Sequence, residues 1–195
     1  MRLIQIIWIL VVLAFVFGCQ KKEQAEQEVA GQEEVTTTTE QEAVSIADVS
    51  AFSYVCLPFM GSYESHEKVI GDFMQVAGTQ GIELSGPMLG IYYNSPMDTP
   101  ADSLVWEIGF EVPDTTKVSE PLVIKTWDFT KVAKATHTGT YETVDQTYPQ
   151  IFEFIGKQNM MPAGPTMERF LSDPQKVAPE ELKTEIWVPV SSRQM

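Results

Sequence analysis

The chain has 195 residues, enough for one domain of ordinary size and a tail, and its hydrophobic content of 44% is enough for a real core. Its 27 acidic and 13 basic residues give a formal net charge of −14. This balance argues against nucleic acid or an anionic membrane surface as an electrostatic partner, and it favours a cationic ligand.

Residues 1–18 have the layout of a secretory signal: Arg2, an apolar run from Leu3 to Phe17, and Gly18 before Cys19. The segment resembles the signal peptide of a bacterial lipoprotein. This resemblance implies cleavage before Cys19, lipidation of Cys19, and an anchor in the bacterial cell envelope on the extracytoplasmic side. An uncleaved transmembrane anchor is the alternative, although the run is shorter than the roughly 20 residues that span a bilayer comfortably.

Residues 19–42 are polar and acidic and contain almost no large apolar side chains. Such a segment buries too little surface to offset its chain entropy. We therefore interpret it as a flexible acidic tether that follows the lipidated N-terminus, with a reach on the order of 25–30 Å. The folded domain is expected over residues 43–195.

The domain contains an internal repeat. Gly61 and Gly139 lie 139 − 61 = 78 residues apart, and the same offset aligns Gly86 with Gly164, Leu104 with Leu182, and Glu107 with Glu185, among other identities. Several of the matched residues are glycines or prolines, which have specific roles in turns. The sequence therefore predicts a duplication, with repeats at about 44–112 and 122–190.

Each repeat predicts one strand, one helix and two further strands. In the first repeat, the patterns favour strands over 52–60, 86–93 and 104–112 and a helix over 64–79. In the second, they favour strands over 131–137, 166–171 and 182–190 and a helix from Glu142. Gly71 and Pro149 occupy matching places in the helices, so we expect a kink, or a short turn before the main helix, in both repeats.

These elements predict an α+β fold made of duplicated β-α-β-β units with pseudo-twofold symmetry. The helices are expected on one side of an antiparallel sheet, with a ligand groove between the halves. Leu104, Trp106 and Ile108 alternate on the face that the helix covers, which places Glu107 on the other face. By the same register, Glu185 and Trp187 lie on the uncovered face, where the two glutamates can share a groove.

A carboxylate with aromatic walls can bind an organic cation, because a cation over an aromatic ring gains about 0.5–2 kcal/mol. The candidate ligand-binding residues are Glu185, Trp187, Glu107, Tyr92, Phe170, Tyr141 and Tyr148.

The same residues also have an ordinary structural interpretation. Glu185 can be a solvated strand residue, and Tyr141 and Tyr148 can simply pack a helix against the sheet. The sequence does not decide on which face of the sheet Tyr92 and Phe170 lie. The neighbouring Arg169 must also avoid burial, so one of the two faces has to accept a charge.

No metal site or cofactor is expected. His66 and His137 are far apart in sequence, His137 is expected to pack near a strand end, and no zinc-ligand spacing or phosphate-binding glycine loop is present. Nucleophile signatures are absent, and Cys56 is expected as a buried thiol within a strand.

The motifs from His137 to Tyr141, Gly164-Pro165, Asp173-Pro174 and above all Pro179 to Val190 resemble the GyrI-like small-molecule-binding domain. This is the effector-binding domain of AraC-type and MerR-type transcription regulators. The resemblance implies that Glu185 matches an acidic residue in the ligand groove. Some members are hydrolases of reactive small molecules. Members of this family often have a tyrosine two residues after the position of Glu168, whereas this chain has Phe170 there.

We therefore expect a membrane-tethered, extracytoplasmic module that binds a small apolar, cationic or aromatic organic molecule. No nucleic acid is expected as a partner, since no helix-turn-helix region accompanies the domain. One alternative is a small-molecule hydrolase in which Glu185 is the general base, which requires a raised pKa in a desolvated groove. Another is an envelope interaction protein whose groove is filled by its own side chains.

Overall fold

Antiparallel strands carry the fold in the computed structural model, which describes residues 43–193. The strands are β1 (Ser45–Asp48), β2 (Phe52–Met60), β3 (Met88–Tyr92), β4 (Val105–Glu111), β5 (Val123–Trp127), β6 (Lys131–Thr138), β7 (Met160–Pro162), β8 (Thr166–Phe170) and β9 (Lys183–Ser192). The helices are α1 (His66–Thr79) and α2 (Tyr148–Lys157), with short 3₁₀ helices η1 (Tyr63–Ser65), η2 (Ala101–Ser103), η3 (Tyr141–Thr147) and η4 (Pro179–Glu181).

The expected signal peptide, the lipidated Cys19 and the tether lie outside the described residues. Within residues 43–193, no helix is long and apolar enough to cross a membrane.

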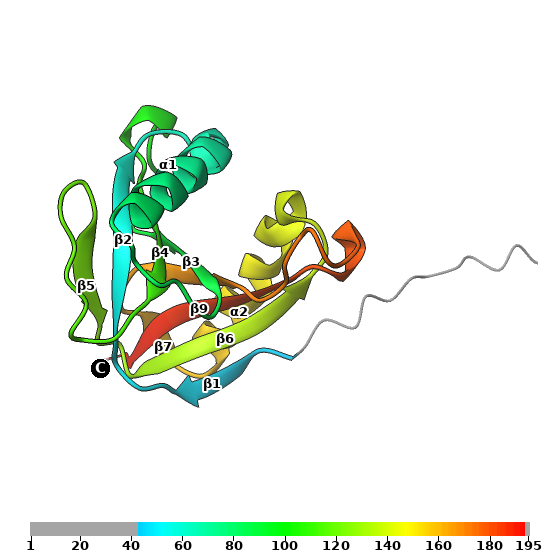
Figure 1. The fold of residues 1–195 in the computed structure, drawn as a ribbon. Coiled ribbons are helices and arrows are strands. Elements are labelled where there is room, and N and C mark those ends of the chain that lie inside the picture. Colours follow the sequence, from blue (N-terminus) through cyan, green and yellow to red (C-terminus); the bar gives the residue numbers. More distant parts are fainter. Residues whose placement is uncertain (1–42, 194–195) are drawn as a thin grey trace, which may run out of the picture. The chain divides into compact units, whose positions relative to one another are not determined.

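The strands form one sheet in the order β1-β6-β9-β8-β3-β4-β2-β5, and β7 pairs with β9 beside this path (Figure 1). The register of the sheet repeats the offset of 78 residues. For example, Ser45 pairs with Lys134, and the equivalent residues Val123 and Cys56 pair with each other. The two repeats are therefore related by a pseudo-twofold rotation that passes between β3 and β8.

The repeats also exchange their first strands. β1 belongs to the first repeat but pairs with β6 of the second, whereas its equivalent β5 pairs with β2 of the first. Each half of the sheet thus contains an edge strand from the other half of the sequence. This exchange explains how two units that are each too small to cover an apolar face form one structure.

A short 3₁₀ helix precedes the α-helix in both repeats, which confirms one of the two expected arrangements. η1 leads into α1, and η3 leads into α2. Pro149 lies in the first turn of α2, where its missing N–H costs no helical hydrogen bond. Gly71 lies inside α1 and is exposed.

Each face of the sheet carries apolar packing. On the helix side, α1 covers a cluster built on Phe73, Trp106 and Ile108, and α2 covers a second cluster built on Ile151 and Ile186. On the far side, a third cluster contains Tyr54, Cys56, Leu89, Trp127 and Trp187. The side chains of Trp127 and Trp187 approach with ring centroids 6.5 Å apart, although their strands are distant in the sheet order. The far face is therefore a filled core.

The structure confirms the predicted α+β fold, with its duplicated units and antiparallel sheet. β2 has the predicted bounds, and the other predicted strands differ from the observed ones by one or two residues at an end. β1, β5 and β7 were not predicted. They are short, and β1 and β5 take their hydrogen-bond partners from the other repeat, so local alternation does not mark them.

Candidate ligand-binding site between the two helices

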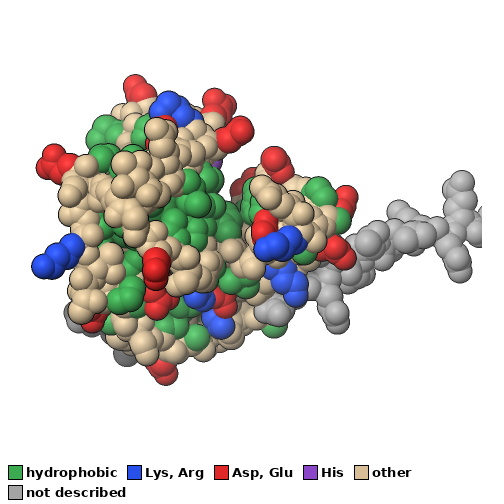
Figure 2. Space-filling view, in the orientation of Figure 1, with side chains coloured by type: hydrophobic (Ala, Val, Ile, Leu, Met, Phe, Trp, Pro, Cys, Tyr) green, Lys and Arg blue, Asp and Glu red, His purple; other side chains and the backbone are tan. Residues whose placement is uncertain are grey.

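A strip of sheet lies between the areas that the two helices cover. It consists of alternate residues of the two central strands, Met88, Gly90 and Tyr92 of β3 and Thr166, Glu168 and Phe170 of β8, which are paired across the pseudo-twofold axis. We call these six residues the inter-helix strip. Figure 2 shows hydrophobic side chains gathered in the hollow between the lobe that carries α1 and the lobe that carries α2.

Glu168 is the one carboxylate of the strip, and it is only 9% exposed. Tyr148 of α2 donates a hydrogen bond to Oε1 of Glu168 at 2.6 Å. The hydroxyl of Tyr92 lies 3.2 Å from Oε2. Burial raises the pKa of Glu168, and the hydrogen bonds from Tyr148 and Tyr92 offset part of that rise. The side chain is thus a buried acid held at both oxygens by phenols from the two repeats.

Gly90 makes room for this arrangement. It pairs with Glu168 in the β3–β8 ladder, and a Cβ at Gly90 would lie 2.6 Å from the hydroxyl oxygen of Tyr92. The ring of Tyr92 therefore lies across the backbone of Gly90 and reaches the glutamate of the other repeat. A side chain at this position would force the tyrosine away.

His66, at the start of α1, extends the polar contacts of Tyr92. Its Nε2 lies 3.0 Å from the Tyr92 hydroxyl, and its Nδ1 contacts the backbone carbonyl of Tyr63. The imidazole packs against Trp106 with ring centroids 4.3 Å apart, and Tyr63 meets Tyr92 edge to face at 5.2 Å. Burial lowers the pKa of His66.

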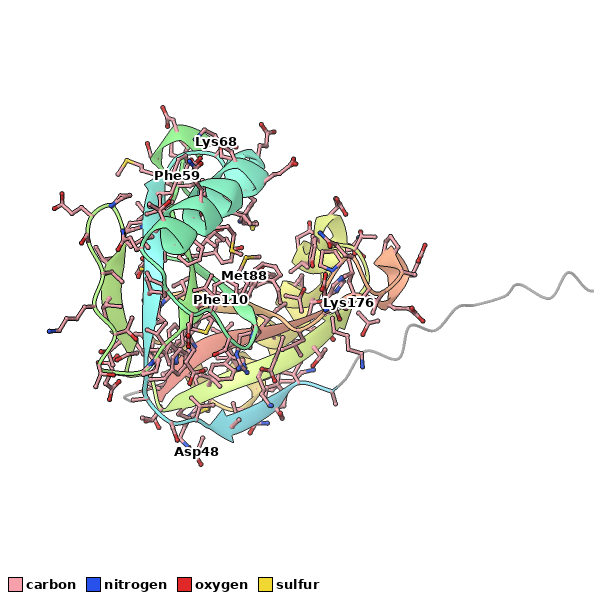
Figure 3. The ribbon with its side chains drawn as sticks, viewed as in Figure 1. Asp48, Phe59, Lys68, Met88, Phe110 and Lys176 are labelled. Atoms are coloured by element: carbon pink, nitrogen blue, oxygen red, sulfur yellow. The ribbon has the colours of Figure 1, made fainter. Side chains whose placement is uncertain are left out.

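The end of the strip at Met88 and Phe170 is apolar. Met88 pairs with Phe110 on one side and with Phe170 on the other, and Phe110 stacks on Phe73 of α1 at 5.7 Å. Figure 3 shows Met88 and Phe110 pointing into the space between α1 and the second repeat. Met88, Phe170 and the neighbouring Phe110 are only partly buried, so an apolar ligand can contact them without displacing the core.

The predicted site residues separate into two groups on opposite faces of the sheet. Tyr92, Phe170, Tyr141 and Tyr148 lie on the helix side. Tyr92 and Tyr148 bind Glu168, and Tyr141 contacts Phe170 edge to face at 5.4 Å. The structure therefore decides that Tyr92 and Phe170 lie on the helix side. Arg169 points to the far face, and Glu168 is the charged residue on the helix side.

Glu107 lies on the far face and is 1% exposed. It accepts hydrogen bonds from Tyr54 at 2.7 Å and Tyr93 at 2.8 Å, and it forms an ion pair with Lys125 at 2.5 Å. Its carboxylate is therefore already satisfied by three partners.

Glu185 and Trp187 occupy the related position in the second repeat. Glu185 forms ion pairs with Lys134 at 3.0 Å and Arg169 at 2.8 Å, and it accepts a hydrogen bond from Trp187 at 2.8 Å. The guanidinium of Arg169 stacks over Trp187 at 4.6 Å. Burial alone would raise the pKa of Glu185, but hydrogen bonds from Lys134 and Arg169 lower it.

The structure therefore corrects the prediction of an open groove along Glu107 and Glu185. The far face is occupied by a third core, and both carboxylates are neutralised by cations of the same domain. The lowered pKa of Glu185 is also the opposite of what a general base needs near neutral pH. A binding role for Glu107, Glu185 or Trp187 stays a prediction.

Glu168, His66 and Tyr63 were not among the predicted site residues. A signal for Glu168 exists in the repeat, because its equivalent is Gly90: a charged residue in the second repeat replaces a glycine in the first. His66 carries no such signal, since its proximity to Tyr92 arises only when α1 packs on the sheet.

A hollow of about 360 Å³ lies elsewhere, at the end of β6. Its lining includes His137, Gly139, Thr143 and Glu180, and it touches neither Glu168 nor Glu185. His137 is buried, and its ring nitrogens contact the hydroxyls of Thr147 at 2.9 Å and Thr143 at 3.1 Å. This histidine packs near a strand end, as expected. Over the described range 43–193, no three His, Cys, Asp or Glu side chains gather as a metal site.

Several solved structures share this fold. The EcmrR C-terminal domain is 15% identical, with a TM-score of 0.69 over 79% of this chain and 99% of that one. A hydrolase from Listeria innocua is 15% identical, with a TM-score of 0.56 over 82% and 97%. SAV2435, whose structure contains bound tetraphenylphosphonium, is 14% identical, with a TM-score of 0.52 over 77% and 94%. At these identities the likeness concerns the fold alone. No curated protein matches the sequence.

The sequence pattern of one family covers most of the chain. The GyrI-like small molecule binding domain matches residues 42–191, which includes both repeats and the whole inter-helix strip. The chain belongs to the GyrI-like family of small-molecule binding domains.

Proposed function

We propose that this domain binds a small lipophilic organic cation on the inter-helix strip, with Glu168 as the counter-charge. The observation that carries the proposal is the position of Glu168: a buried carboxylate on the pseudo-twofold axis, surrounded by aromatic and apolar side chains. The two phenols that bind Glu168 are neutral, and a buried charge without a counter-charge is costly, so a cation beside Glu168 gains more there than it would beside a solvated carboxylate.

The aromatic side chains around Glu168 suit the same ligand class. Tyr92, Tyr148 and Phe170 lie on the helix side with it, and a cation over an aromatic face gains about 0.5–2 kcal/mol. The formal net charge of −14 adds a long-range attraction for cations. The bound tetraphenylphosphonium of SAV2435 is a ligand of this kind, which makes it a suitable first probe.

The test is calorimetric titration of tetraphenylphosphonium into the wild-type domain and Glu168→Gln. Glutamine keeps the size of the side chain and one acceptor oxygen but removes the charge. A hydrogen-bonded charge contributes about 1.5–3 kcal/mol, so we expect at least a tenfold loss of affinity in the variant. Equal affinities would refute Glu168 as the counter-charge, and the absence of binding to the wild type would refute the ligand class.

Hydrolysis is a second candidate, and the raised pKa of Glu168 is the observation that favours it, since a general base operates best with a pKa near the working pH. Incubation with an electrophilic aromatic substrate tests it. Turnover that disappears in Glu168→Gln, while Glu185→Gln remains active, would identify an enzyme. No turnover in the wild type would leave binding as the function.

We further propose that the domain works at the extracytoplasmic side of the bacterial envelope, anchored through Cys19. The support is the sequence of residues 1–19 and the acidic segment that follows it. Expression of wild type and Cys19→Ser with labelled palmitate tests this. We expect label and membrane fractionation for the wild type only; equal labelling of both proteins would overturn the assignment.

A further inference from the structure

Three polar side chains form a continuous hydrogen-bonded chain that includes two residues of the inter-helix strip, Tyr92 and Glu168, together with His66. Nε2 of His66 lies 3.0 Å from the Tyr92 hydroxyl, and the same hydroxyl lies 3.2 Å from Oε2 of Glu168. The chain crosses from α1 through β3 to β8. It has one hydroxyl proton in the middle and a titratable group at each end.

A third contact fixes the tautomer of the histidine. Nδ1 of His66 contacts the backbone carbonyl of Tyr63, and a carbonyl can only accept. Nδ1 must therefore carry a proton. In a neutral imidazole, Nε2 is then the acceptor, so the Tyr92 hydroxyl donates to His66, and its oxygen accepts from Glu168 only when that carboxyl group is protonated.

Only two proton arrangements satisfy every member of the chain. In the first, protonated Glu168 donates to Tyr92, and Tyr92 donates to neutral His66. In the second, imidazolium His66 donates to Tyr92, and Tyr92 donates to the Glu168 carboxylate. The two differ by the transfer of one proton from Oε2 of Glu168 to the Tyr92 oxygen, and of the tyrosine's own proton to Nε2 of His66.

We propose that His66 is the internal proton acceptor of the ligand site, which lets Glu168 ionise when a cation binds without releasing a proton to solvent. The inference rests on the proposed function and goes beyond it. His66 is then a specificity-determining residue, because it allows the same site to present a neutral acid to a neutral ligand and a carboxylate to a cation.

The surroundings favour the uncharged arrangement in the empty site. Burial raises the pKa of Glu168 and lowers that of His66. Among the described residues, the titratable groups that contact the chain are phenols: Tyr63 from η1, whose pKa burial raises to about 12, and Tyr148 from α2, whose pKa burial raises further. The charged residues beside His66 in sequence, Glu64, Glu67 and Lys68, are exposed to water.

The first experiment counts protons during binding. Tetraphenylphosphonium is titrated near neutral pH in two buffers of different ionisation enthalpy, with the wild type and with His66→Gln. We expect the wild type to give the same enthalpy in both buffers, and His66→Gln to release close to one proton per bound cation. Release of about one proton by the wild type, or none by either protein, would overturn the relay while leaving Glu168-dependent binding intact.

The second experiment needs no ligand. The chain has two histidines, so NMR titration can follow His66 with His137 as an internal reference. The relay predicts a neutral His66 with its proton on Nδ1 in the free protein. It also predicts that the His66 titration midpoint falls in both Glu168→Gln and Tyr92→Phe, because the imidazolium loses the nearby carboxylate charge in the first variant and its hydroxyl acceptor in the second. An unchanged His66 midpoint in both variants would refute the relay, whether or not the proposed ligand binds.

Discussion

Gly90 and Glu168 face each other across the β3–β8 ladder, and they are also equivalent residues of the two repeats, since 168 − 90 = 78. The pseudo-twofold axis passes between them. A symmetric pair of glutamates here would bring two buried carboxylates together, and like charges at that spacing cannot both ionise. With glycine in one repeat, a single acid remains on the axis, and the freed space holds the ring of Tyr92.

Gly90→Ala tests this division of roles. The new Cβ would lie 2.6 Å from the Tyr92 hydroxyl, so Tyr92 must move away from Glu168 and His66. We expect a loss of about 1–3 kcal/mol in the free energy of unfolding, together with weaker tetraphenylphosphonium binding. Chemical denaturation and calorimetry measure the two effects.

Gly71→Ala is the matched control. A Cβ at Gly71 meets nothing within 4 Å, and alanine stabilises an exposed helix interior by about 0.5–1 kcal/mol relative to glycine. We expect higher stability and unchanged binding. A Gly90→Ala protein that matched this control in both measurements would show that the space above Gly90 is not needed.

Glu168 should make stability depend on pH in a defined direction. Its folded pKa is raised above the usual 4.5, so above that pH the unfolded chain has lost a proton that the folded protein still holds. The contribution of Glu168 to stability is therefore complete below about 4.5 and declines as the pH rises through the folded pKa.

Glu168→Gln removes this term. We expect the free energy of unfolding of the wild type, relative to Glu168→Gln, to decrease from pH 4.5 upward, as measured by urea denaturation at a series of pH values. Because His66 is linked to Glu168 through Tyr92, the same comparison is repeated in a His66→Gln background, which removes the titration of His66. A difference that stays constant with pH, or that increases, contradicts the raised pKa.

Glu185→Gln tests which face of the sheet binds the ligand. Glu185 neutralises Lys134 and Arg169 on the far face, so its replacement leaves both cations without a counter-charge. We expect a loss of about 1–3 kcal/mol in stability, typical of a removed buried partner, with little change in tetraphenylphosphonium affinity. A loss of affinity at unchanged stability would instead favour the far face as the binding site.

The exchanged edge strands allow a comparison between equivalent residues. Ile46 of β1 packs against the core beneath α2, whereas its repeat equivalent, Ile124 of β5, is 36% exposed. We expect Ile46→Ala to cost about 1–2 kcal/mol, by loss of part of a buried side chain, and Ile124→Ala to cost less. Thermal denaturation of the two variants checks this order; the reverse order would mean that β1 contributes little to the second half of the sheet.

The sequence by itself determined the duplication, the order of the main elements and the family resemblance. These are properties of local alternation and of one fixed offset, which the strand registers repeat pair by pair. It also placed Glu107 and Glu185 correctly on the face away from the helices. Periodicity assigns a side chain to a face; the apolar alternation has no exception in 104–112, and in 182–190 only Thr184 interrupts it.

Only the tertiary structure decided which face is filled and where the buried acid lies. The far face closes into a core because strands distant in the sheet order bring Trp127 and Trp187 together, which no local pattern encodes. Glu168 becomes a candidate site because the twofold pairing sets it opposite Gly90, and because phenols from both repeats reach it. A glutamate where the other repeat has glycine marks a conflict in sequence; its partners exist only after the two halves have packed.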